Sequence, residues 1–114
     1  MSPPVLTDEM RYKLLKLVDG NPGMSQRRVA RELGISLGRV NFCVNALIEA
    51  GLIKVANFKN SNNKSAYIYL LTSRGIKEKT RVTARFLRRK IQEYEALQAE
   101  IEQIRSDVLR QKSG

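Results

Sequence analysis

The 114-residue sequence predicts an α+β fold that is mainly α, with three short helices, a two-stranded hairpin and one long C-terminal helix. Three observations support this prediction. Up to residue 51, apolar residues recur at steps of three and four, as they do on the buried face of a helix. Residues 53–58 and 66–71 are instead rich in β-branched and aromatic types, which favour strands. From residue 73 to about Leu109, no proline and, after Gly75, no glycine interrupts the helical pattern.

The charge balance points to a polyanionic partner. The chain carries 21 Lys and Arg against 11 Asp and Glu, a formal net charge of +10, and it contains no histidine. Nucleic acid is the commonest partner of so basic a small protein, and an anionic membrane surface is the second. The sequence also lacks a Cys/His zinc set and a glycine-rich phosphate loop. We therefore expect no enzyme activity, no cofactor and no metal.

The chain is expected to be cytoplasmic and not to associate with a membrane. No apolar run approaches the ~20 residues of a transmembrane helix. Residues 1–4 have neither the basic nor the apolar region of a secretory signal. The single cysteine, Cys43, cannot form an intrachain disulfide and suits a reducing compartment.

Each predicted helix is preceded by a hydroxyl side chain that can cap its free N–H groups. These N-cap residues are Thr7, Ser25, Ser36 and Thr72. The first helix is predicted to end near Val18, before a turn-forming loop at 19–23. Glycines at positions 34 and 51 end the second and third helices, because a left-handed residue commonly follows a helix.

Residues 25–53, SQRRVARELGISLGRVNFCVNALIEAGLI, contain the most informative pattern. Two helices are separated by a Gly-Ile-Ser turn, with the small Ala30 where they must approach closely, which is a helix-turn-helix pattern. The hairpin that follows has a polar, Asn-rich loop and corresponds to a wing. We therefore predict a winged helix-turn-helix domain that binds double-stranded DNA, with the recognition helix at 36–50 in the major groove and the wing tip at 58–65 near the minor groove.

The chain divides into four predicted segments. They are a flexible arm at 1–6, the winged helix-turn-helix DNA-binding domain at 7–72 with its wing at 53–71, a long dimerisation helix at 73–109 and a frayed tail at 110–114. The long helix spans on the order of 50 Å, which is more than a core this small can cover. It must therefore project from the domain and pack on something else.

The sequence resembles the MarR family of bacterial winged-helix regulators over residues 10–76. The matching features are ARELGIS before the recognition helix, the V-x-x-x-V-x-x-L-x-x-x-G-L-I run at 40–53, and LTSRG at 71–75, which looks like the family's Leu-Thr-x-x-Gly signature after the wing. The short chain with a single long C-terminal helix looks closest to the MarR-type regulators associated with exopolysaccharide gene clusters. The resemblance implies a transcriptional regulator that binds a pseudo-palindromic operator as a homodimer.

Two departures from the family pattern limit what can be carried over. Many MarR proteins have an Asp followed by an Arg near the wing tip, where this sequence has Asn63, Lys64 and Ser65. Lys64 can still enter a minor groove, but less well than a planar guanidinium. The family also commonly forms its dimer and effector pocket from additional terminal helices, most of which are missing here. The sequence therefore argues against a small-molecule effector.

The recognition helix has a core face and an opposite face. The core face carries Val40, Cys43, Val44 and Leu47. The opposite face presents the predicted base-reading residues Leu37, Gly38, Arg39, Asn41, Phe42 and Asn45. Arg39 can pair with guanine, while both asparagines suit adenine; the alternative is an ordinary solvated helix surface. Phe42 has two open interpretations, which are contact with a thymine methyl or sugar, and cover for the core against the first helix.

Other residues are expected to position the DNA backbone. The predicted phosphate-positioning residues are Ser25, Gln26, Arg27, Arg28 and Ser36, and the predicted wing contacts are Lys59, Asn60, Asn62, Asn63 and Lys64. The start of the second helix offers free N–H groups and cationic side chains, although a solvated charged face is the alternative. An Asn-rich tip is also simply a good turn. Cys43, on the inner side of the recognition helix, is predicted to be a buried structural thiol and not a redox sensor.

The long helix carries an apolar seam. Its predicted dimer residues are Leu87, Ile91, Tyr94, Leu97, Ile101, Ile104 and Val108, at steps of three and four. Residues 74–90 carry eight basic side chains and one acidic, whereas residues 91–107 carry one basic and five acidic. A parallel pair of helices would set like charges side by side. We therefore predict an antiparallel homodimer whose helices cross near residues 90–94.

Two other functions are compatible with the same pattern. A winged helix can dock a partner protein as an interaction adaptor, and a basic domain can bind DNA without sequence preference as an architectural protein. The arginines at 81, 85, 88 and 89 can also form a phosphate or membrane stripe. The dependence of binding on salt and on DNA sequence separates these possibilities.

Overall fold

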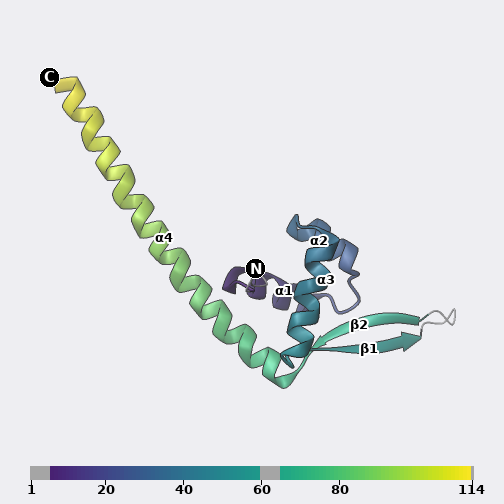
Figure 1. The fold of residues 1–114 in the computed structure, drawn as a ribbon. Coiled ribbons are helices and arrows are strands. Elements are labelled where there is room, and N and C mark those ends of the chain that lie inside the picture. Colours follow the sequence, from purple (N-terminus) through teal and green to yellow (C-terminus); the bar gives the residue numbers. More distant parts are fainter. Residues whose placement is uncertain (1–5, 60–64, 114) are drawn as a thin grey trace, which may run out of the picture.

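The computed structural model describes residues 6–59 and 65–113, with all side chains in these ranges except those of 57–59, 65–67 and 113. The elements follow in the order α1 (Asp8–Gly20), α2 (Gln26–Leu33), α3 (Leu37–Glu49), β1 (Ile53–Lys59), β2 (Ser65–Leu71) and α4 (Ser73–Ser113). Helices α1–α3 form a cluster, the hairpin projects from one side of it, and α4 leaves it on the other (Figure 1). The fold is the predicted mainly α winged helix-turn-helix with a long C-terminal helix.

The predicted capping residues define the helix ends. The hydroxyls of Thr7, Ser25 and Ser36 each accept a hydrogen bond from the backbone N–H three residues further on, at 3.1–3.2 Å. Gly34 follows α2 in the left-handed conformation, with a φ of 68°. These contacts confirm the predicted N-caps and set the turn that joins α2 to α3.

One hydrophobic core holds the three helices and the base of the wing together. Its buried side chains are Leu14, Leu15, Val18, Met24, Val29, Ala30, Val40, Cys43, Val44, Leu47, Leu52 and Ile53. The strands pair antiparallel from Ile53 opposite Leu71 to Lys59 opposite Ser65. The wing therefore begins inside the core and projects away from it.

Two element ends differ from the prediction. Helix α1 includes Asp19 and Gly20, which the sequence predicts to lie in a loop, because the N–H and Nδ2 of Asn21 both donate to the Leu17 carbonyl and extend the last turn. Helix α4 continues to Ser113, through most of the predicted frayed tail. The predicted arm at 1–5, the wing tip at 60–64 and residue 114 lie outside the described residues.

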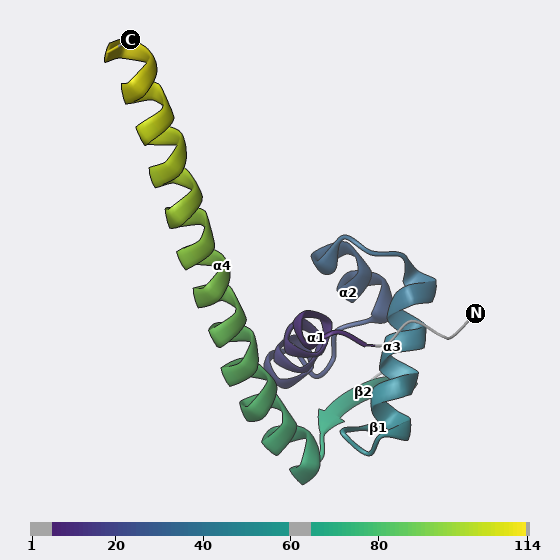
Figure 2. The ribbon, with the colours of Figure 1, turned by 60° about the vertical axis from the view of Figure 1, so that its left-hand side comes forward.

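Helix α4 begins directly after β2 and close to the end of α3 (Figure 2). The Thr72 hydroxyl donates to the Gly51 carbonyl at 2.5 Å and accepts from the Gly75 N–H at 3.0 Å. The Thr72 N–H donates to the Leu52 carbonyl at 3.0 Å. A Cβ atom at Gly75 would lie 2.0 Å from that carbonyl oxygen. Only glycine at this position lets α4 pass so close to the chain that enters the wing.

The first half of α4 packs along α1. Val82 is fully buried, and the rings of Tyr12 and Phe86 stack with centroids 4.9 Å apart. Arg85 donates two hydrogen bonds of 3.0 Å to the carboxylate of Asp8, and this guanidinium holds the pKa of Asp8 below its usual range. The rest of α4 extends away from the domain, so the longest dimension of the molecule is 76 Å.

We expect Gly75→Ala to destabilise the protein by about 1–3 kcal/mol or more, because the added methyl group overlaps the Leu52 carbonyl. Urea unfolding followed by circular dichroism measures the change in the free energy of unfolding. Gly20→Ala is the matched control, since a Cβ there meets nothing within 4 Å, and it should leave stability unchanged or raise it by up to about 1 kcal/mol. Equal effects of the two substitutions would contradict the close approach at Gly75.

Candidate nucleic-acid interface

Helix α3 presents an exposed face opposite its core face. The four predicted core residues are at most 3% exposed. All six predicted base-reading residues are exposed: Leu37, Gly38, Arg39, Asn41, Phe42 and Asn45. One helix surface therefore carries a guanidinium, two amides and an aromatic ring. This is the set of side chains that the helical period predicts for the outer face.

Apolar and small groups lie among the polar ones on this face. Leu37 and Phe42 are each 42% exposed. Among the described residues, Phe42 is not one of those that pack against the core, so the structure gives no support to its interpretation as core cover. A Cβ at Gly38 would meet nothing within 4 Å, so the fold itself does not require glycine there. The face leaves room for a close approach at its N-terminal end.

A chain of hydrogen bonds connects this face to α2 and to the wing. Asn45 Nδ2 donates to Asn41 Oδ1 at 3.1 Å, and Asn41 Nδ2 donates to Gln26 Oε1 at 3.3 Å. Gln26 Nε2 in turn donates to the hydroxyl of Tyr69, in β2, at 3.0 Å. Sequence reasoning missed Tyr69, because it lies in a strand 43 residues from its partner and no local pattern connects the two.

The predicted phosphate-positioning residues are of three kinds. Arg27 and Arg28 are exposed at the start of α2. The hydroxyls of Ser25 and Ser36 already serve as N-caps. Gln26 is half-buried, and both ends of its amide are bonded inside the protein. The two arginines are therefore better placed than Gln26 to meet a phosphate.

The predicted wing contacts run from the last residue of β1 to residue 64. Lys59 is the last residue of β1, opposite Ser65, and its side chain is outside the described part. The other four predicted contacts also lie outside the described residues: Asn60, Asn62, Asn63 and Lys64. The described strands show only that the wing projects away from the helix cluster (Figure 1).

Cys43 belongs to the core and not to the exposed face. Its side chain is 3% exposed. Burial raises the pKa of the thiol above its ordinary value, and the nearby charge of Arg39 offsets only part of that effect. A buried thiol that stays protonated is a poor nucleophile. The predicted burial of this thiol is confirmed.

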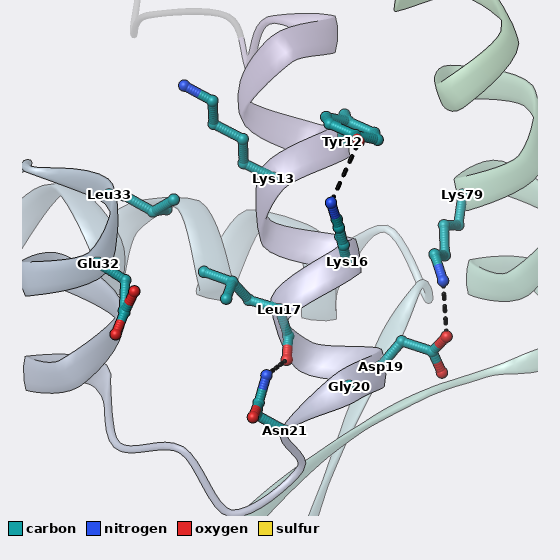
Figure 3. A pocket seen from close by; sticks show the side chains of 10 residues that line it. All are labelled: Tyr12, Lys13, Lys16, Leu17, Asp19, Gly20, Asn21, Glu32, Leu33 and Lys79. Atoms are coloured by element: carbon teal, nitrogen blue, oxygen red, sulfur yellow. Dashed lines mark hydrogen bonds and ion pairs between the residues drawn. The ribbon is translucent and has the colours of Figure 1, made fainter.

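An open cleft of about 620 Å³ lies between α1, the end of α2 and α4 (Figure 3). Its lining carries both signs of charge. Lys79 Nζ lies 2.7 Å from Asp19 Oδ2, and Lys16 Nζ donates to the Tyr12 hydroxyl at 3.4 Å. Lys13 Nζ lies 3.0 Å from Glu9 Oε1 on the same helix. The cations of this cleft are thus engaged by groups of the protein itself.

The predicted dimer seam is exposed along α4. Its seven residues are between 43% and 61% exposed in the single chain: Leu87, Ile91, Tyr94, Leu97, Ile101, Ile104 and Val108. Most of the seam lies beyond the contact of α4 with α1 (Figure 2). A long exposed apolar stripe on an otherwise polar helix marks an interaction surface.

Two further findings concern the described residues only. Within them, no group of three or more His, Cys, Asp and Glu side chains could hold a metal ion. None of the helices in that part of the chain is both long and apolar enough to cross a membrane.

Comparison with known proteins shows which proteins share this fold. Residues 7–54 match the family model described as winged helix-turn-helix DNA-binding. No curated protein sequence matches the chain significantly. Solved structures do match, among them the PcaV transcriptional regulator from Streptomyces coelicolor in complex with its natural ligand. It has a TM-score of 0.67 and 21% sequence identity, over 95% of this chain and 75% of that one.

Two other solved structures also match this chain. A MarR/EmrR family transcriptional regulator from Acinetobacter sp. ADP1 has a TM-score of 0.59 and 20% identity, over 86% of this chain and 73% of that one. CouR, a transcriptional repressor bound to a 23-mer DNA duplex, has a TM-score of 0.51 and 28% identity, over 64% of this chain and 50% of that one. This chain therefore spans about half the length of CouR. The protein is a winged helix-turn-helix protein whose domain and long C-terminal helix are built like those of MarR-type regulators of known structure.

Proposed function

We propose that this protein is a transcriptional regulator that binds double-stranded DNA with sequence preference, as a homodimer on a pseudo-palindromic operator. Helix α3 would lie in the major groove and the wing tip near the minor groove. The observation that carries the proposal is the exposed face of α3, where Arg39, Asn41 and Asn45 share one surface of a winged helix-turn-helix. Guanidinium and amide groups are the ones that pair with the edges of guanine and adenine.

Charge and likeness to a DNA-bound structure support the same proposal. The net charge of +10 favours any duplex over most other partners, because DNA carries a dense array of phosphates. CouR, whose fold this chain resembles, is a repressor solved on a 23-mer duplex. We place the protein in the cytoplasm, where a regulator of the bacterial type that it resembles would meet chromosomal DNA. The narrower likeness to exopolysaccharide-associated regulators rests on the sequence motifs alone.

Within this proposal the side chains of α3 take distinct roles. Arg39 pairs with guanine, and the amides of Asn41 and Asn45 face adenine. Phe42 and Leu37, which are each 42% exposed, contact thymine methyl groups or sugars. Arg27 and Arg28 at the start of α2 hold a phosphate and set the depth of α3 in the groove without reading sequence.

The exposed seam of α4 supports the homodimer. Two copies of the seam would cover each other, and a symmetric pair would present two copies of α3 to the two half-sites of one operator. An antiparallel pair centred on residue 92 sets Arg89 level with Glu95 of the partner subunit, and Lys77 level with Asp107 of the partner subunit. The segregated charges of the helix therefore favour the antiparallel arrangement.

The cleft between α1, α2 and α4 gives no support to a small-molecule effector. Each of its three lysines is already bonded, to Glu9, Tyr12 or Asp19. The carboxylates of Glu9 and Asp19 offset the charge of two of these lysines, which lowers the attraction of the cleft for an acidic ligand. A nonspecific architectural role is the second candidate, and the eight basic side chains at 74–90 are the observation that favours it.

Arg39→Ala tests whether Arg39 reads a base pair or only contacts the DNA backbone. On a preferred duplex the substitution should cost about 1–3 kcal/mol of binding free energy and relax the preference at one base pair of each half-site. Arg27→Ala is the matched control, since loss of a phosphate contact weakens binding equally on all sequences and lowers the salt slope by about one. Fluorescence anisotropy on preferred and random duplexes at several salt concentrations measures both effects. A uniform loss in Arg39→Ala would show that Arg39 contacts phosphate.

Disulfide crosslinking tests the orientation of the helix pair. In a Cys43→Ala background, Ile91→Cys should crosslink readily, because residue 91 lies next to the crossing point of an antiparallel pair. Ile101→Cys should not, because its two copies would lie about 27 Å apart along the axis, far beyond disulfide reach. Non-reducing gel electrophoresis after mild oxidation gives the result. Efficient crosslinking at both positions would indicate a parallel pair instead.

A further inference from the structure

The amides on the outer face of α3 do not act one by one. Asn45, Asn41 and Gln26 form a continuous donor–acceptor chain, with donor–acceptor distances of 3.1 Å and 3.3 Å, and it ends 3.0 Å further on at the Tyr69 hydroxyl. Two members of this chain are exposed on α3, whereas Gln26 and Tyr69 are half-buried. The exposed amides are therefore connected to a fixed point inside the fold.

Tyr69 is well suited to be that fixed point. Its side chain packs against the hydrophobic core, and together with Met24 and Val44 it lines a small cavity there. Its backbone N–H donates to the Pro22 carbonyl at 3.1 Å, which ties β2 to the loop before α2. Ring and backbone are thus both held, and the hydroxyl is presented to Gln26 from a defined position.

An exposed amide without a partner can turn by 180° and exchange its donor with its acceptor. In this hydrogen-bonded series each amide donates one N–H to the oxygen of the next side chain, so the orientation of each amide depends on its neighbour. Turning one amide alone would set two oxygens or two NH₂ groups against each other, so the three amides keep a common orientation, and the Tyr69 hydroxyl holds the Gln26 end of the series in place. Asn45 keeps its Oδ1 and one N–H for a ligand, which is the pair of groups that adenine N6 and N7 require.

We propose that Tyr69 is a positioning residue for base recognition, whose hydroxyl aligns the amides of Asn41 and Asn45 through Gln26. The proposal rests on the proposed function, because it concerns the base pairs that these amides contact. It also changes the role of Gln26, which becomes a relay between the wing strand and α3 instead of a phosphate ligand. Sequence preference at part of the operator then depends on a residue anchored in the core.

Tyr69→Phe in the full chain is the direct test, since it removes the hydroxyl and keeps the ring that packs in the core. Affinity for a preferred duplex should fall about 2- to 10-fold, as expected for one lost hydrogen bond. Preference should relax at the same base pairs that Asn41→Ala affects, and Tyr69→Phe should add little in the Asn41→Ala background. Affinity for random duplex and the salt slope should stay unchanged.

Tyr12→Phe is the matched control, because it also removes a hydroxyl that accepts a hydrogen bond, in this case from Lys16 on α1. It should leave the base preference as it is in the unsubstituted protein. If Tyr69→Phe also leaves the preference unchanged, or lowers binding to preferred and random duplexes by the same factor, the proposal is wrong.

A second measurement needs no DNA. In the free protein, Tyr69→Phe should shift the side-chain NH₂ resonances of Gln26, Asn41 and Asn45 together and make all three exchange faster with solvent. A change confined to Gln26 would overturn the relay. If the unsubstituted protein shows no sequence preference at all, the proposed function fails and the statement about base preference fails with it. The resonances then still decide whether Tyr69 aligns the amides.

Discussion

The structure depends on the close contact between the start of α4 and the chain that leaves α3. Thr72 bonds the Gly51 and Leu52 carbonyls, and Gly75 lets the first turn of α4 pass over Leu52. The end of α3, strand β2 and the start of α4 therefore meet within a few residues. The direction in which α4 leaves the domain is set by this contact and by the packing of α4 along α1, where the rings of Tyr12 and Phe86 stack.

This arrangement assigns different tasks to different parts of the chain. The outer face of α3 carries polar groups with little charge, whereas the first half of α4 is strongly basic. Five of its eight basic side chains form ion pairs within the protein: Lys79, Arg81, Arg85, Arg89 and Lys90. The formal charge therefore overstates what this helix offers to DNA, because part of it holds α4 against α1 or pairs along the helix.

The elements that local patterns control are the ones that the sequence predicts well. Hydroxyl caps, a left-handed glycine after α2 and the core face of α3 all follow from residues a few positions apart, and the structure confirms them. The relay from Asn41 to Tyr69 joins residues from three elements and becomes visible only when the fold brings them together. For the same reason the position of Gln26 in α2 alone predicts a phosphate contact, whereas tertiary contacts decide what its amide bonds.

Central to the proposed function is that two copies of α3, held apart by the paired α4 helices, read two related half-sites. Selection of binding sites from a pool of random duplexes, with the full chain, tests this claim most directly. The predicted result is an inverted repeat whose half-sites are centred about one helical turn, or a multiple of it, apart, with guanine and adenine among the preferred bases. A pool that stays random while the protein binds it with a steep salt dependence would contradict the claim.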